Sequence, residues 1–347
     1  MHKIFTMDKF IGLPINQKSI LGIGNALIDV LINITDDSVL QKFGLPKGSM
    51  TLVDAVLSAE IKKETKNFNR IIQTGGSAAN TIHAVAKLGG QCGYIGKISN
   101  DEMGNFFLSD FTEHNINTHF FYSETGTGHA TALISSDSER TFGTYLGAAL
   151  ELTPEEMSSE IIGKYGILHI EGYLVQNHAL IEAAMKTAKD KGLLVSIDMA
   201  SFNIVEANLE FLHEIILKYV DIVFANEEEA LALTGKNPLE AVEAIAEMCS
   251  IAVVKLGAQG SVIQTGERVI RIEAIPAKSI DTTGAGDIYA AGFLYAMTQN
   301  LNLEVAGKIG SLLAGNVVEV MGAKIPPHTW ERLLPQIELL KKFDLNI

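Results

Sequence analysis

Short, continuous apolar segments alternate with longer amphipathic segments in the part of the chain that follows Pro154. The short segments are typical of strands buried on both faces, and the longer ones repeat their apolar residues at helical spacing. Alternating strands and helices indicate a parallel sheet with helices on both faces. The pattern predicts strands at 166–170, 193–197, 221–225 and 251–256, and helices at 179–189, 209–219 and 239–248.

The first half of the chain begins with an apolar strand at 20–24 and then interrupts the α/β pattern with further short strands. Turn residues separate them, and we expect 118–122 and 130–135 to form a hairpin. Two helices, 303–320 and 328–340, are expected to end the chain. We therefore predict one domain over 20–340, with a small β-sheet lid formed by about 30–54 and 118–146.

The amino-acid composition limits the classes of function that the protein can have. The 347 residues can bury a large core, and 47% of them are hydrophobic. A formal net charge of -14 argues against nucleic-acid or anionic-membrane partners. Residues 1–20 contain lysines and no unbroken apolar run, so we expect no signal peptide. With only Cys92 and Cys249 and no C-x-x-C pattern, a reducing, cytoplasmic location is expected.

The most informative stretch is 279–287, Ser-Ile-Asp-Thr-Thr-Gly-Ala-Gly-Asp, followed by an apolar helix. Gly284, Ala285 and Gly286 allow backbone N–H groups to converge at a helix N-terminus, which favours a bound anion. Asp287 beside such a cradle is suited to receive the proton of a hydroxyl that attacks phosphorus. The alternative is a plain helix cap.

Two N-terminal glycine motifs are candidate ligand sites. The segment from Gly24 to Asp29 is not a dinucleotide fingerprint, because Leu27 stands where the third glycine is needed. Asp29 is then either a cap or a ligand for hydroxyls. Paired glycines at 75–76 precede another helix, and Asn80 on its first turn can reach a ligand or cap the helix.

Further polar residues follow the predicted parallel strands, at the edge where such sheets bind ligands. Asn226 and Glu229 come after the strand at 221–225, although acidic residues at a helix start are favoured by the dipole alone. Gly257 and Gly260 predict a tight hairpin after Lys255, which either adds positive charge for phosphates or faces solvent.

Asp-Thr-Thr-Gly-Ala-Gly-Asp at 281–287, Gly-Gly-x-x-x-Asn at 75–80 and Asn-x-x-Glu at 226–229 together resemble the ribokinase, or PfkB, family of carbohydrate and nucleoside kinases. The resemblance implies a ribokinase-like α/β fold: a doubly wound, mostly parallel sheet with helices on both faces and a small β-sheet lid. It also implies ATP and Mg²⁺, with K⁺ as a monovalent activator.

The resemblance assigns expected roles residue by residue. Arg140 is either a solvated turn residue or a phosphate contact from the lid. The expected catalytic residues are Asp287, Gly284, Ala285, Gly286 and Arg140. The expected acceptor site is Asn25, Asp29, Gly75, Gly76, Ser77 and Asn80. The expected ATP site is Asn226, Glu229, Lys255, Gly257, Gly260 and Asn316, with Asn226 and Glu229 placing Mg²⁺ largely through water, and Asp281 and Thr283 holding K⁺.

The acceptor is less defined than the reaction. The segments 24–29, 75–77 and 144–148 are most similar to the adenosine-kinase-like branch, which implies transfer to the 5′ hydroxyl of adenosine or another ribonucleoside. A sugar kinase acting on ribose, fructose or a related sugar is the alternative. A non-catalytic nucleotide or sugar sensor is the alternative of another class. The expected partners are the small-molecule substrate and ATP, with the chain a monomer or a homodimer through the lid.

Overall fold

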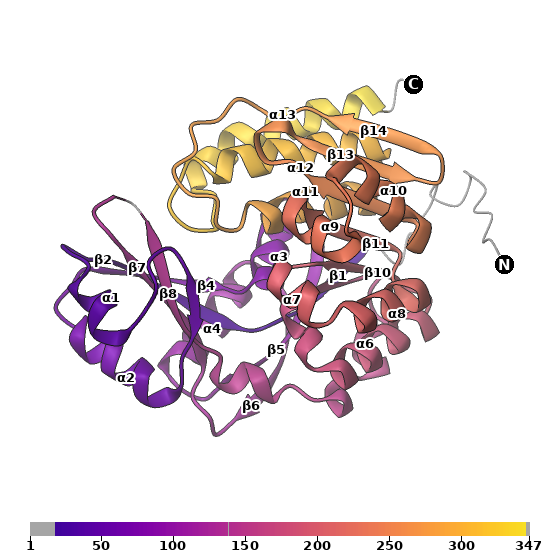
Figure 1. Cartoon of the computed structure of the whole chain (residues 1–347). Coiled ribbons are helices and arrows are strands. Elements are labelled where there is room, and N and C mark those ends of the chain that lie inside the picture. Colours follow the sequence, from indigo (N-terminus) through magenta and orange to yellow (C-terminus); the bar gives the residue numbers. More distant parts are fainter. Residues whose placement is uncertain (1–17, 138, 345–347) are drawn as a thin grey trace.

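The computed structural model describes residues 18–137 and 139–344 (Figure 1). Most of the segment on which we predict no signal peptide, residues 1–17, lies outside the described residues, as does Ser138. Within the described range nine strands form one large sheet, in the order β14-β13-β12-β11-β10-β9-β1-β5-β6. They are β1 (Ser19–Ile23), β5 (Gln91–Ser99), β6 (Asn117–Ser123), β9 (Ile167–Glu171), β10 (Leu194–Asp198), β11 (Ile222–Asn226), β12 (Ile251–Lys255), β13 (Ser261–Thr265) and β14 (Arg268–Ile272).

All neighbouring strands from β12 to β6 are parallel, and only β13 and β14 pair antiparallel. Residues of one strand alternate between the two faces, as β11 illustrates. Ile222 and Phe224 join the core on one face, whereas Val223 and Ala225 join the core on the other. Burial on both sides explains why these strands are continuously apolar.

Helices cover both faces of the large sheet, as the alternating pattern predicts. One face carries α3 (Ser77–Lys87), α4 (Glu102–Glu113), α11 (Ala285–Thr298), α12 (Leu303–Val317) and α13 (Pro327–Asp344). The other carries α5 (Ser159–Ile162), α6 (His178–Asp190), α7 (Phe202–Ala207), α8 (Leu209–Tyr219), α9 (Glu227–Thr234) and α10 (Pro238–Met248). The predicted doubly wound α/β fold is confirmed.

A second sheet has five strands within the described range, in the order β3-β8-β7-β2-β4. With α1 (Ser38–Phe43) and α2 (Ala55–Glu64) it stands to one side of the large sheet (Figure 1). Its strands are β2 (Leu27–Asn33), β3 (Met50–Leu52), β4 (Arg70–Gly75), β7 (Gly128–Ile134) and β8 (Arg140–Tyr145). Asp29 therefore lies within a strand of this sheet, not in the turn that precedes it.

The predicted hairpin between 118–122 and 130–135 is wrong. The first of these segments, β6, is an edge strand of the large sheet, parallel to β5, whereas β7 belongs to the small sheet. Between β6 and β7 the chain crosses from one sheet to the other. Along this crossing the Asp101 carboxylate accepts hydrogen bonds from the Thr127 N–H (2.8 Å) and hydroxyl (2.7 Å), which hold the connection in place.

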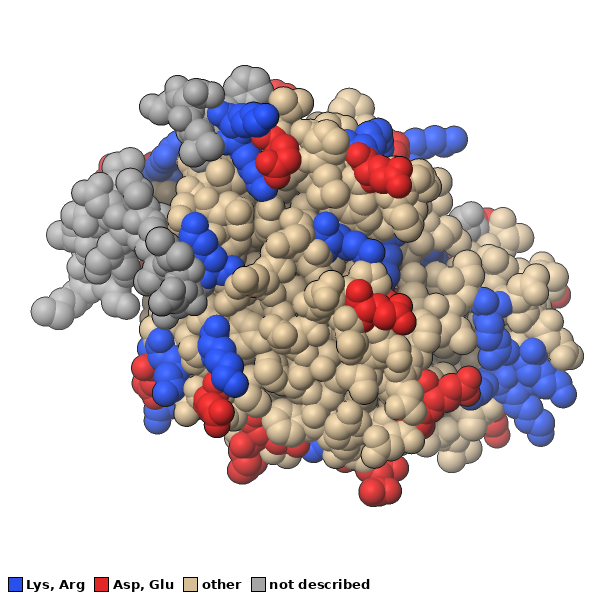
Figure 2. Space-filling model, turned by 180° about the vertical axis from the view of Figure 1, so that it is seen from behind, with Lys and Arg blue, Asp and Glu red and all other residues tan. Residues whose placement is uncertain are grey.

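The surface is mixed in charge on the face seen in Figure 2, where acidic and basic side chains are interspersed among uncharged ones. Among the described residues no helix is long and apolar enough to cross a membrane. Of the polar residues predicted to form a site, Asn226 and Lys255 end β11 and β12, Ser77 and Asn80 lie on α3, and Asp287 lies on the first turn of α11.

Candidate active site

The N-terminus of α11 has no side-chain cap among the described residues. Gly284 precedes the helix with φ 74°. A Cβ on Gly284 would lie 2.3 Å from the Ala323 Cβ, so both the conformation and the packing require glycine. The first N–H groups of a helix have no acceptor within the helix, and the positive end of a 14-residue dipole lies here. The predicted cradle at 284–286 thus has the backbone chemistry that phosphate requires.

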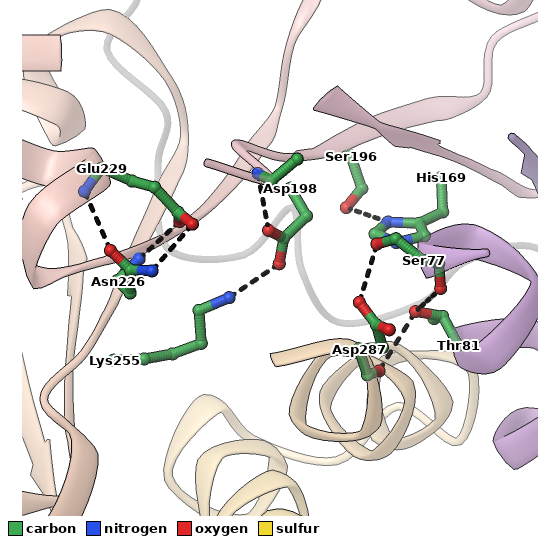
Figure 3. Close-up of polar contacts among 10 residues, drawn as sticks. Ser77, Thr81, His169, Ser196, Asp198, Asn226, Glu229, Lys255 and Asp287 are labelled. Carbon is green, nitrogen blue, oxygen red and sulfur yellow. Dashed lines mark hydrogen bonds and ion pairs between the residues drawn. The ribbon is translucent and has the colours of Figure 1, made fainter. Parts of the chain in front are cut away.

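Asp287 lies on the first turn of α11 and is held by α3. The Ser77 hydroxyl donates to its Oδ1 (2.7 Å), and the Thr81 hydroxyl donates to its backbone oxygen (3.1 Å) (Figure 3). The Asn80 amide donates to its Oδ2 (3.0 Å). Burial raises the pKa of Asp287 to about 7, because desolvation outweighs the hydrogen bonds that favour the charged form. The carboxylate is therefore oriented, and more basic than an ordinary aspartate.

Glu171, which the sequence analysis did not select, orders the predicted acceptor site. It ends β9 and accepts hydrogen bonds from the Asn25 N–H (2.9 Å), the Asn25 amide (2.6 Å) and the Ala78 N–H (3.0 Å). Burial raises the pKa of Glu171 to about 7. The rule that selected Asn226, that ligands bind where parallel strands end, applies equally to Glu171, so a signal was present in the sequence.

The turn that Glu171 holds is compact. Gly76 has φ 97°, and a Cβ there would lie 2.1 Å from the Asn25 carbonyl oxygen. Glycine at this position lets the start of α3 approach the loop after β1, which brings Asn25 and Ser77 to the same place. Gly75 and Asp29 are also close, because a Cβ on Gly75 would lie 2.4 Å from the Asp29 carboxyl group. Burial raises the pKa of Asp29 to about 6.

A cavity of about 670 Å³ opens between the small sheet and the large one. Of the predicted acceptor residues, Asn25, Gly76 and Ser77 line it, together with Glu171. The small sheet and the loops next to it supply an apolar wall. That wall comprises Leu27, Met50, Leu52, Ala130 and Leu146, and Leu174 and Ile204 face it from the main body. Among the described residues that line this cavity, none is lysine or arginine.

Lys255 lies beside the cradle. Its Nζ is 2.8 Å from the Asp198 Oδ2, and a Cβ on Gly286 would lie 2.8 Å from the same Nζ. Burial lowers the pKa of Lys255, but the Asp198 and Glu229 carboxylates outweigh burial and raise the pKa above its ordinary value. Lys255 is therefore a buried cation, 14% exposed, and not the solvated side chain that the sequence left open.

Asn226 and Glu229 form a reciprocal cap at the start of α9. The Asn226 side chain accepts from the Glu229 N–H (2.8 Å), and the Glu229 carboxylate accepts from the Asn226 N–H (2.7 Å) and amide (2.8 Å) (Figure 3). Burial raises the pKa of Glu229 to about 7, and the nearby Asp198 carboxylate adds to the shift. Carboxylate oxygens suit Mg²⁺, and the engaged geometry of Glu229 favours contact through water.

Arg140 connects the small sheet to the loop before the cradle. It begins β8, and its guanidinium lies 2.7 Å from the Asp281 Oδ2 and donates to the Thr283 hydroxyl (3.3 Å). The Asp281 carboxylate also accepts from the N–H groups of Thr283 (3.0 Å) and Gly322 (2.6 Å). Arg140 is thus 9% exposed and forms an ion pair with Asp281, so it is not a solvated turn residue.

The remaining predicted ATP residues lie near the ends of β12 and α12. Gly257 and Gly260 bound the tight turn between β12 and β13, as predicted. Asn316 is buried in α12, where its amide donates to the Leu312 carbonyl (2.8 Å) and its oxygen accepts from Arg332 (2.5 Å). Both polar ends of Asn316 are therefore already engaged.

The chain is similar to known kinases over most of its length. The model of the pfkB family of carbohydrate kinases matches residues 48–330, and the chain belongs to that family. A 5-dehydro-2-deoxygluconokinase of Listeria innocua is 31% identical over 273 residues, which cover 74% of this chain and 83% of that protein.

Two solved structures share the fold over 92% of this chain and 98% of theirs. The adenosine kinase of Sinorhizobium meliloti is 33% identical with a TM-score of 0.83. A probable sugar kinase of Rhizobium etli is 31% identical with a TM-score of 0.84. The protein is accordingly a PfkB-type carbohydrate or nucleoside kinase, and the predicted family and ribokinase-like fold are confirmed.

Proposed function

We propose that the protein transfers the γ-phosphoryl group of ATP to the 5′ hydroxyl of adenosine or a closely related ribonucleoside. The observation that carries the proposal is the position of the basic, buried Asp287 between an uncapped helix N-terminus and a large cavity. Ser77 bridges the two, since it lines the cavity and its hydroxyl holds the Asp287 carboxylate.

Each residue has a chemical task in this reaction. Asp287 accepts the hydroxyl proton as the acceptor oxygen bonds to the γ-phosphorus, and the bond from that phosphorus to the ADP oxygen breaks. The N–H groups of Gly284, Ala285 and Gly286 stabilise the charge on the transferred group. Lys255 supplies a buried positive charge beside them, and Arg140 supplies a second from the small sheet.

The ions would act at the same edge. Mg²⁺, bound with ATP, neutralises phosphate charge, and Glu229 and Asn226 would position it through water. We propose the Asp281 and Thr283 loop as the K⁺ site. There a monovalent ion would share the Asp281 carboxylate with Arg140.

The cavity favours a neutral acceptor with an apolar part. A sugar acid or sugar phosphate requires a cationic partner, and the cavity lining contains neither lysine nor arginine. The apolar wall of Leu27, Met50 and Leu52 suits the face of a purine base, whereas a free sugar would leave it uncovered. Asn25 and Asp29 would hold the ribose hydroxyls. The small sheet would then serve as a lid that excludes water during transfer.

Relatives named as 5-dehydro-2-deoxygluconokinases support a second candidate, a sugar-acid kinase. ATP consumption with adenosine, inosine, guanosine, cytidine, ribose, fructose and 5-dehydro-2-deoxygluconate distinguishes the candidates. We expect adenosine to give the highest kcat/KM, with 5′-AMP as its product. A higher kcat/KM for any sugar or sugar acid would refute the nucleoside acceptor and leave the kinase intact.

Asp287→Asn is the control for the chemistry. It should consume ATP far more slowly with every acceptor while still binding nucleotide in calorimetry. ATP binding by the wild-type protein without turnover of any acceptor would instead support the sensor alternative.

A further inference from the structure

A cluster of metal-ligand side chains lies away from the proposed active site, where α3 packs against α4. His83 comes from α3, Asp110 from α4, and His114 directly follows α4. Each offers one ligand atom, and these atoms all lie within 4.8 Å of one another. The His114 Nδ1 is 3.3 Å and the His83 Nε2 is 3.8 Å from an Asp110 carboxylate oxygen.

One atom of the cluster is buried without a partner. His83 is only 8% exposed, and its Nε2 has no hydrogen-bond partner among the described residues. The same atom faces the Asp110 carboxylate beyond hydrogen-bonding distance. A buried polar atom left unsatisfied costs free energy, and a ligand that reached it would recover that cost.

Lys324 occupies part of the cluster in the structure. Its Nζ is 3.1 Å from the Asp110 Oδ2, and it also donates to the Thr74 hydroxyl. Thr74 in turn donates to the same carboxylate. The Asp110 charge is therefore balanced by an ammonium that has a second partner, Thr74, within reach.

We propose that His83, Asp110 and His114 bind a divalent transition-metal ion of the Zn²⁺ or Co²⁺ class, with water completing the coordination. Two imidazoles and one carboxylate are a donor set that such ions favour over Mg²⁺. On binding, the Lys324 ammonium leaves Asp110 and stays with Thr74. The His83 Nε2 gains the partner that it lacks. The two imidazole rings are 4.3 Å apart between centroids, and binding through the His114 Nδ1 replaces its contact with the Asp110 backbone oxygen (2.7 Å).

The ion would tie α3 to α4. Ser77 and Asn80, which hold the Asp287 carboxylate, lie on the first turns of the same helix as His83. Binding at His83, in the middle of α3, therefore stabilises the helix whose first turn orients the proposed base. The cluster shares no residue with the proposed Mg²⁺ and K⁺ sites, so its ion is chemically and spatially separate from them.

Calorimetric titration of untagged protein with Zn²⁺, without nucleotide and in a large excess of Mg²⁺, tests the proposal. Mg²⁺ blocks the sites made of oxygen donors, so we expect one Zn²⁺ per chain. His114→Asn removes a ligand at a partly exposed position and should raise the Kd at least about tenfold. His328→Asn changes an exposed histidine outside the cluster and should leave the Kd unchanged.

Two further measurements test the proposal even if one variant fails to fold. Zn²⁺ should raise the melting temperature of the wild-type protein and not that of His114→Asn, since a ligand that binds only the folded state stabilises it. Lys324→Met removes the competing ammonium and should lower the Kd. The same Kd in the wild type and in folded His114→Asn, or no Zn²⁺ binding by the wild type, would overturn the proposal.

Discussion

Replacing Asp287 by asparagine should remove activity and at the same time make the fold more stable at neutral and alkaline pH. The pKa of Asp287 is about 7 in the folded protein against an ordinary value of 3.8. When folding raises the pKa of an aspartate, the folded protein loses stability as the pH increases from the lower to the higher of those two values. At about 1.4 kcal/mol per pKa unit, the raised pKa lowers the free energy of unfolding by about 4 kcal/mol at pH 8 and by about 2 kcal/mol at pH 5.

The hydrogen bonds to Asp287 are already included in its raised pKa, because they favour the charged form and partly offset desolvation. Asparagine keeps an oxygen for the Ser77 hydroxyl but presents an amide N–H₂ toward the Asn80 amide. Asn80 can resolve this conflict by turning its amide, because its Oδ1 is buried and has no hydrogen-bond partner among the described residues. At pH 5 the folded protein holds Asp287 protonated, so aspartic acid and asparagine both make neutral hydrogen bonds there. We therefore expect asparagine to raise the free energy of unfolding by about 4 kcal/mol at pH 8 and by about 2 kcal/mol at pH 5.

Urea unfolding of wild type and Asp287→Asn at pH 5 and pH 8 measures this difference directly. Steady-state kinetics on the same proteins should show kcat reduced by about 10²–10⁴, the usual contribution of a positioned base. In the wild type, kcat/KM should rise with pH up to about 7, as the base form of Asp287 becomes populated. A stability difference that does not depend on pH would show that burial does not raise this pKa, and near-normal kcat would exclude Asp287 as the base.

Three further predictions concern the groups around Asp287. Lys255→Met should reduce kcat at least about 10²-fold and lower the free energy of unfolding by about 3–5 kcal/mol, since it leaves the Asp198 carboxylate buried and unpaired. The double variant Lys255→Met, Asp198→Asn should recover the resistance to urea but not the activity. Glu171→Gln should raise the acceptor KM about tenfold with a smaller effect on kcat, because one donor in the turn that holds Asn25 then faces an amide N–H₂; an unchanged KM would contradict its positioning role. Activity should disappear in EDTA, return with Mg²⁺ and rise with K⁺, and Asp281→Asn should abolish only the K⁺ response; full turnover in EDTA, or equal stimulation of both proteins by K⁺, would refute these assignments.

Sequence reasoning works for this protein where the chemistry is local. The cradle at 284–286 and Asp287 are contiguous, and helix dipole, glycine conformation and carboxylate position can all be predicted from one segment. Long amphipathic segments also predict their elements well, because helical periodicity is repeated over several turns: the predicted helix at 209–219 coincides with α8 (Leu209–Tyr219). These features need no knowledge of distant contacts.

The failures arise where a distant partner decides the outcome. The segment 118–122 has an equally acceptable strand pattern in either sheet, and its place is given by parallel pairing with β5, a strand from an earlier part of the chain. Glu171 looks like an ordinary strand end until Asn25 and Ala78, more than 90 residues away, are seen to donate to it. Hydrogen bonds between such separated residues have no periodic signature in a sequence.

The raised pKa values of the carboxyl groups in the site also arise only when distant strands come together. They explain why these carboxyl groups favour a nearby cation. Asp287, Glu229 and Glu171 all have pKa values near 7 because the sheet edge removes them from water. Lys255 balances Asp198 and only partly offsets the other carboxylates. In the protein without ligand, these buried acidic groups therefore lower the free energy of unfolding. A Mg²⁺ ion brought with ATP would lower the cost of ionising Glu229, so substrate binding and formation of the active charge state would support each other.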